Sequence, residues 1–141
     1  MSLTLPSASA YPPQASAAFD GENGMAALAR EFAAAFLARV QKVHGVPVTA
    51  RLIGAVCLVV SELITNAVKY APGPCLLDLA LADGELHVTV GDTEAGLPVT
   101  LTPDAGRIGG HGLEIVLGLS RGYEVERQPG GKRVRAHIPL D

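Results

Sequence analysis

The 141-residue sequence contains no tryptophan, and aromatic residues make up only 4% of it. Small and aliphatic side chains, mainly Ala, Val and Leu, must therefore fill most of the interior. Charged residues are also sparse, at 18%, and the formal net charge is −3. Because contacts of Lys and Arg with phosphates dominate non-specific nucleic-acid affinity, this composition gives no electrostatic attraction toward DNA or RNA. We therefore expect no nucleic-acid partner.

Cysteine and histidine are too few or too scattered to suggest a disulfide framework or a metal centre. The two cysteines, Cys57 and Cys75, match no disulfide or metal-binding spacing. Cys57 lies within the apolar run AVCLVV and is expected to be a small buried hydrophobe. The histidines are His44, His87, His111 and His137. Their separation along the chain differs from the ligand spacings of known metal sites, so the sequence predicts no metal cluster.

The sequence also lacks evident membrane and export signals. No apolar run approaches the roughly 20 residues that a membrane-spanning helix needs. The N-terminus contains SASA, but it has neither a basic segment nor a sustained apolar core, so it is a poor signal peptide. These absences predict a cytoplasmic protein with no membrane partner.

The sequence does contain enough apolar residues, 48% of the chain, for one folded domain with its own core. Residues 1–21 are rich in Ser, Ala and Pro, and Pro12-Pro13 prevents a long helix. We expect this stretch to be a flexible N-terminal tail, followed by a single domain over residues 22–141.

Two helices are predicted at the start of the domain. The first has apolar residues at helical spacing from Asn23, its expected N-cap, to Gly45, with Pro47 beyond its end. The second runs from Thr49, another plausible N-cap, to about Tyr70, where Pro72-Gly73-Pro74 stops it. The apolar face of the first helix, with Phe32 and Phe36, packs either on the domain core or against a partner, and the sequence leaves both open.

After Pro74 the apolar pattern changes to a period of two, which is typical of strands. CLLDLALA and ELHVTVGD are predicted to pair through a turn at Asp83-Gly84. An irregular glycine-rich segment over 93–112 precedes a short helix from about Leu113 to Leu119, and a closing hairpin crosses Pro129-Gly130-Gly131. Segregated helices and strands predict an α+β fold: a two-layer α/β sandwich whose mostly antiparallel mixed sheet is covered by helices on one face.

Polar side chains gather on one side of the otherwise apolar second helix. Glu62 and Asn66 are one turn apart, and Lys69 follows three residues later, so all three point the same way. A solvated face near the helix end is the simple alternative. However, Asn has a poor helix propensity and is followed here by two apolar residues, which favours a polar patch that faces a cleft.

Two further segments could complete a binding site. Asp92 closes the apolar strand LHVTVGD, where a buried carboxylate would need a donor such as an exocyclic amine, although a turn or cap role is equally compatible. In GGHGLEIV, residues 109–116, glycines precede a helix, so that backbone N–H groups and the helix N-terminus form an anion site suited to phosphates.

Four stretches in this order carry a resemblance to a known superfamily. ELITNAVKYA, VGDTEAGLP, GGHGLEIV and PGGKRV resemble the N, G1, G2 and final boxes of the GHKL (gyrase, heat-shock-protein-90, histidine kinase, MutL) ATP-binding superfamily. Within it, the small size and short lid resemble anti-sigma-factor serine/threonine kinases. The resemblance covers about Asn23 to the C-terminus and implies the Bergerat ATP-binding fold, with ATP and Mg²⁺ as cofactors.

The resemblance implies a role for each matching residue. Asn66 would bind Mg²⁺ through its side-chain oxygen, Glu62 would be the general base, and Asp92 would bind the adenine amino group. Lys69 would lie near the phosphates and Tyr70 beside the nucleotide. The remaining expected nucleotide contacts are Gly96, Gly109, Gly110, His111, Gly112 and Leu113.

The sequence departs from the family pattern in two boxes. Glu94 stands where the first glycine of the G1 box is expected, which adds bulk and charge near the adenine pocket. Lys132 and Arg133 stand in the final box, where a Thr or Ser commonly supports the contact between the Asp and adenine. Both changes bear on nucleotide affinity and neither alters the predicted fold.

Three functions follow as hypotheses. The first is an ATP-dependent serine/threonine protein kinase that binds a sigma factor and phosphorylates an anti-anti-sigma (STAS-type) partner. The second is a non-catalytic or weakly nucleotide-binding module that switches between partners and regulates transcription by sequestration. The third is a structural α/β sandwich without a ligand. The resemblance also implies a homodimer.

Overall fold

The computed structural model describes residues 13–20, 24–70, 73–92, 110–128 and 131–140. Within these ranges the side chains at positions 70, 110–113, 115 and 128 are not described. The elements are β1 (Gln14–Phe19), α1 (Met25–His44), α2 (Ala50–Tyr70), β2 (Cys75–Ala82), β3 (Glu85–Asp92), α3 (Gly110–Leu119), β4 (Gly122–Gln128) and β5 (Gly131–Pro139).

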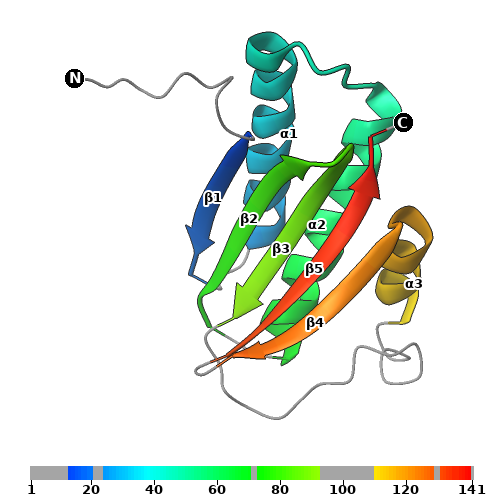
Figure 1. Ribbon diagram of the computed structural model, residues 1–141. Helices are drawn as coiled ribbons and strands as arrows, with labels where there is room; N and C mark the ends of the chain where they lie inside the picture. The colour runs from blue at the N-terminus through cyan, green and yellow to red at the C-terminus, as the bar shows by residue number, and fades with distance from the viewer. Residues whose placement is uncertain (1–12, 21–23, 71–72, 93–109, 129–130, 141) are drawn as a thin grey trace.

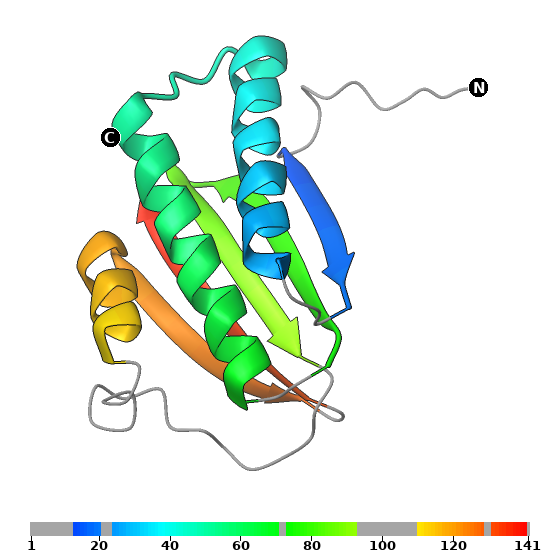
Figure 2. The same cartoon turned by 180° about the vertical axis from the view of Figure 1, so that it is seen from behind.

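The strands form one five-stranded sheet in the order β1-β2-β3-β5-β4. All three helices lie on the same face of this sheet (Figures 1 and 2). This confirms the predicted α+β two-layer sandwich. The expectation of a mixed sheet is wrong for the described strands, because each of their four pairings is antiparallel.

The predicted N-terminal tail contains a strand. β1 pairs antiparallel with β2, from Gln14 opposite Ala80 to Phe19 opposite Cys75. The Asp78 carboxylate on β2 accepts hydrogen bonds from the Gln14 side chain (2.8 Å) and the Ser16 hydroxyl (2.6 Å). Burial alternates along β1, but its small Ala and Ser residues resemble a linker in sequence, which is why the strand was missed.

The boundaries of the two long helices follow local chemistry. α1 ends at Gly45, whose left-handed conformation (φ 68°) favours glycine, and α2 begins after Thr49, whose hydroxyl accepts the Leu52 N–H (3.0 Å). The N-cap of α1 is Gly24 rather than the predicted Asn23, and it forms no side-chain cap. Asn23 itself lies outside the described residues.

The apolar face of α1 packs on the domain's own core. Phe36 is only 3% exposed and belongs to the same cluster as Leu37 and Val40, while Phe32 is partly buried against it. Of the two alternatives for this face, packing on the core is therefore the correct one. Cys57, predicted to be buried, is half-buried, and its thiol lies 3.8 Å from the Arg30 carbonyl oxygen on α1.

The central helix is more apolar than the sequence analysis allowed. Residues Ala50–Lys69 reach a mean hydropathy of 1.7 over a length that could cross a membrane. In the fold, however, α2 contacts α1, α3, β2, β3 and β5. The high hydropathy of α2 is explained by this packing, because a helix that contacts so many neighbours is the core helix of the sandwich.

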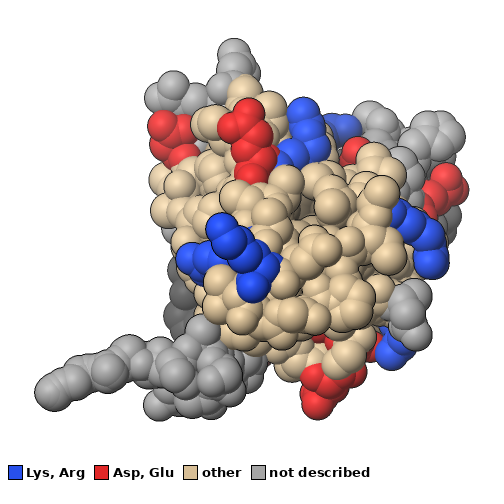
Figure 3. All heavy atoms as spheres, turned by 90° about the horizontal axis from the view of Figure 1, so that it is seen from above, with Lys and Arg blue, Asp and Glu red and all other residues tan. Residues whose placement is uncertain are grey.

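Charged side chains are dispersed over the end of the molecule seen in Figure 3. Lys and Arg lie among uncharged residues there, with Asp and Glu between them, so the described residues on this view form no continuous patch of one sign.

Candidate functional site

The predicted site residues lie at one end of the sandwich. Cys75 at the start of β2 pairs with Asp92 at the end of β3, and Gly91 pairs with Arg133 near the start of β5. The C-terminal end of α2 and the start of α3 lie toward this same end (Figure 2), and α3 packs on α2. The topology therefore gathers segments that are more than 60 residues apart in sequence, from the end of α2 at Tyr70 to Arg133 on β5.

The polar residues of α2 border its packed face. Glu62 and Asn66 are half-buried, next to the buried Leu63 and Ala67, whereas Lys69 is exposed. Half-burial of Glu62 and Asn66 disagrees with a fully solvated helix face, and the cleft itself stays a prediction. Tyr70 is the last residue of α2.

Arg30 is a neighbour of this site that the sequence analysis missed. Its guanidinium on α1 donates to the hydroxyl of Ser61 (3.0 Å), the residue that precedes Glu62 on α2. This contact joins α1 and α2 beside the proposed base. No pattern in the sequence links two residues 31 positions apart, so a structure was needed to find the contact.

Asp92 forms the most buried ion pair among the described residues. Its side chain is 2% exposed, and its Oδ2 lies 3.1 Å from the Nζ of Lys132, whose side chain is 14% exposed. The backbone N–H of Lys132 also donates to Oδ1 (3.3 Å). Asp92 is therefore a buried acceptor at the end of β3 rather than an exposed turn residue. The sequence showed Lys132 only as a departure from the family pattern. In the structure it forms an ionic contact with Asp92, where the pattern has a Thr or Ser hydroxyl.

The negative charge of Asp92 also affects its neighbour on β2. Burial raises the pKa of the Cys75 thiol, and the charge of Asp92 raises it further. Cys75 is thus held in its neutral, protonated form and contributes an apolar wall beside the carboxylate.

Gly131 allows β5 to pass close to Asp92. A Cβ at this position would overlap the carbonyl oxygen of Asp92 and lie 3.2 Å from its Oδ1. We expect Gly131→Ala to displace Asp92, to destabilise the domain by about 1–3 kcal/mol, and to weaken nucleotide binding. Thermal unfolding and nucleotide titration would measure both effects. Gly118→Ala on α3 is the control: nothing lies within 4 Å of its added Cβ, so it should preserve stability and binding.

The predicted phosphate-binding turn lies within a helix. α3 begins at Gly110, about one turn before the predicted start, so Gly110, His111, Gly112 and Leu113 form its first turn. The first N–H groups of a helix have no partner inside it and, with the helix dipole, favour an anion. Gly96, Gly109 and Glu94 lie outside the described residues, so their expected roles stay predictions.

These features together fit a purine nucleotide with a divalent cation. A buried carboxylate can accept the exocyclic amine of a purine, the Asn66 amide oxygen suits Mg²⁺, and the first turn of α3 suits phosphates. Among the described residues, Lys132 brings a charge to the purine end that the family pattern does not have there. The set of residues as a whole fits the nucleotide.

Comparison with known proteins settles the family. Residues 22–138 match the family described as the histidine kinase-like ATPase domain. The chain belongs to this family. The predicted membership of the GHKL superfamily is thereby confirmed, together with an ATP-binding, kinase-like character in general.

The comparison with solved structures agrees with this family assignment. Among 13 similar chains is the histidine kinase domain from the Erythrobacter litoralis EL346 blue-light activated histidine kinase, with a TM-score of 0.53 and 25% sequence identity. The match covers 79% of this chain and 61% of that one, so this chain spans less than two thirds of the structure it resembles. A comparison with curated protein sequences finds no significant match.

Proposed function

We propose that this ATPase-family domain is an ATP-dependent serine/threonine protein kinase that regulates a sigma factor in the cytoplasm. In this proposal it binds the sigma factor, and it phosphorylates an anti-anti-sigma partner of the STAS type on serine or threonine to discharge that competitor. A homodimer is part of the proposal.

The observation that supports catalysis is the pair of half-buried polar residues on α2, Glu62 and Asn66. Binding of ATP alone requires no general base, whereas transfer to a hydroxyl does. A half-buried carboxylate one helical turn from the metal-binding amide could accept the proton of a substrate serine or threonine. The Ser61–Arg30 hydrogen bond (3.0 Å) would hold this part of α2 in place.

Each of the other residues has a part in binding. Asp92 would accept the adenine amine, the first turn of α3 would hold the phosphates, and Asn66 would hold Mg²⁺. Lys69, exposed near the end of α2, would add positive charge near the phosphates. When bound, Mg-ATP supplies the phosphoryl group and an electrophilic metal that neutralises developing charge.

The Asp92–Lys132 ion pair favours a second candidate, a partner-switching module that binds nucleotide weakly. An ammonium donates more strongly than a neutral amine, so Lys132 competes with adenine for the Asp92 carboxylate. In that case the domain would act by sequestering its partner, with little or no turnover.

Titration of the purified domain with Mg-ATP, followed by a radiolabel transfer assay with a STAS-type protein from the same organism, separates the two candidates. Micromolar binding with labelling of serine or threonine is expected for the kinase. If the wild-type domain binds Mg-ATP weakly and Lys132→Thr raises the affinity by about tenfold or more, the domain is the weak nucleotide binder, and Lys132 is the cause of the weak binding. If neither the wild-type domain nor the Lys132→Thr variant binds any ATP analogue at millimolar concentration, the kinase proposal is wrong.

A further inference from the structure

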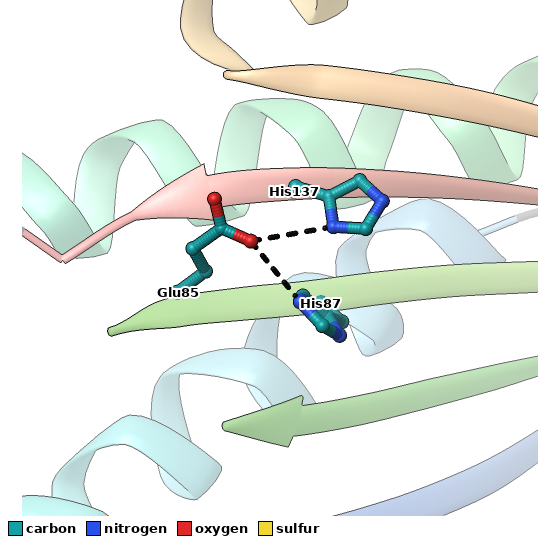
Figure 4. Close-up of side chains that lie close together, drawn as sticks. All are labelled: Glu85, His87 and His137. Atoms are coloured by element: carbon teal, nitrogen blue, oxygen red, sulfur yellow. Dashed lines mark hydrogen bonds and ion pairs between the residues drawn. The ribbon is translucent and has the colours of Figure 1, made fainter. Parts of the chain in front are cut away.

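We propose that Glu85, His87 and His137, on the face of the sheet opposite the helices, form a binding site for a divalent transition-metal ion of the Zn²⁺ class. This site is separate from the nucleotide site and does not depend on the proposed kinase activity. Figure 4 shows both imidazole rings turned toward the Glu85 carboxylate from neighbouring strands.

The strand register creates the cluster. His87 on β3 and His137 on β5 are direct partners across the antiparallel pair, and their ring centroids are 4.5 Å apart. Their separation of 50 positions in sequence is the reason that the sequence predicted no histidine cluster, whereas the strand register brings these two residues together. Glu85 lies on the same strand as His87, two positions away, so it points to the same face.

The spacing of the three potential ligand atoms is close to that of a tetrahedral site. Oε1 of Glu85 lies 3.2 Å from Nε2 of His87 and 3.4 Å from Nδ1 of His137. Ligands at zinc distances are about 3.3–3.5 Å apart in a tetrahedron. All three atoms lie within 4.8 Å of one another. Water would complete the coordination.

The two carboxylates around His137 call for a positive charge between them, either a second proton on the ring or a bound cation. Its Nε2 lies 3.3 Å from Oε1 of Glu124, while its Nδ1 faces Glu85. A neutral imidazole has only one N–H, so it can donate to only one of these two carboxylates. With the proton directed to Glu124, the Nδ1 lone pair faces an anionic oxygen. A metal ion between them turns this repulsion into coordination.

The surroundings resemble those of known metal sites. A carboxylate that holds the second nitrogen of a ligating histidine fixes its tautomer and strengthens it as a ligand, and Glu124 is placed for this role. Arg121 binds Oε2 of Glu85 (3.1 Å), which leaves Oε1 to face the imidazoles.

The donor set selects the chemical class of the ion. Imidazole nitrogens suit Zn²⁺, Co²⁺, Ni²⁺ and Cu²⁺, whereas Mg²⁺ and Ca²⁺ prefer oxygen ligands. A bound ion would join β3 to β5 at the end of the sheet remote from Asp92.

The test is a titration of the tag-free, chelator-treated protein with Zn²⁺ by calorimetry and with Co²⁺ by visible absorption, both without nucleotide. We expect one ion per chain, the intense absorption of tetrahedral Co²⁺, and a rise in the unfolding midpoint with Zn²⁺. His87→Gln and His137→Gln should each lower affinity by about 100-fold or more, and Glu124→Gln by about 10–100-fold.

Two variants serve as controls. His44→Gln removes a histidine at the end of α1, and Asp92→Asn changes the nucleotide site; both should keep wild-type Zn²⁺ affinity. Circular dichroism without metal would establish that each variant is folded. If a variant does not fold, the stoichiometry and the Co²⁺ spectrum of the wild-type protein test the proposal in its place. No binding by the wild-type protein at 100-fold molar excess of Zn²⁺, or equal affinity in both cluster histidine variants, would overturn the proposal.

Discussion

Glu62→Gln is expected to retain Mg-ATP binding and to lower phosphoryl transfer by about 10²–10⁴-fold. Glutamine keeps the size and half-buried position of the side chain but cannot accept the proton of the substrate hydroxyl. Calorimetric titration and a single-turnover radiolabel assay with the proposed STAS-type partner would measure binding and transfer separately.

Glu31→Gln provides the matched control for this experiment. Glu31 is an exposed residue of α1, so the same chemical change there should alter neither binding nor transfer. Undiminished transfer by the Glu62→Gln protein would show that another group, or none, accepts the proton.

Asp92→Asn is expected to weaken adenine nucleotide binding by about 10–150-fold, the equivalent of roughly 1.5–3 kcal/mol for a charged hydrogen bond. The change also leaves the ammonium of Lys132, 14% exposed, without its anionic partner, so we expect a lower unfolding midpoint as well. Nucleotide titration and thermal unfolding of the same samples would follow the two effects.

Asp78→Asn controls for the loss of a carboxylate from the sheet. Asp78 lies on β2, where it accepts hydrogen bonds from Gln14 and Ser16 on β1, so its replacement should leave nucleotide affinity unchanged. The double variant Asp92→Asn with Lys132→Thr removes the unpaired ammonium. If the double variant regains stability without regaining nucleotide affinity, the role of Asp92 in pairing with Lys132 is separate from its role in binding adenine. An unchanged dissociation constant in every Asp92 variant would refute the adenine assignment.

Local sequence signals predicted much of this fold because their physical causes are local. Gly45 and Thr49 mark helix ends through backbone conformation and a side-chain cap. Asp83 and Gly84 have positive φ angles of 56° and 76°, as a two-residue hairpin turn requires. Each of these signals acts within a few residues, so a single sequence is sufficient to recognise it.

The contacts that the sequence did not predict depend on strand pairing between distant segments. Lys132 meets Asp92, and His137 meets His87, only because β5 lies beside β3 in a particular register. A shift of one residue would turn both side chains to the opposite face of the sheet. The position of Asp92 at a strand end was visible in the sequence, but its ionic partner was not.

β1 has a practical consequence for any shortened form of the protein. The family match begins at residue 22, after this strand, so a fragment cut to the matched region would lack it. The outer backbone groups of β2 would then meet water, beside the already exposed Leu76. Unprotected sheet borders of this kind recruit other chains, so such a fragment would be prone to self-association.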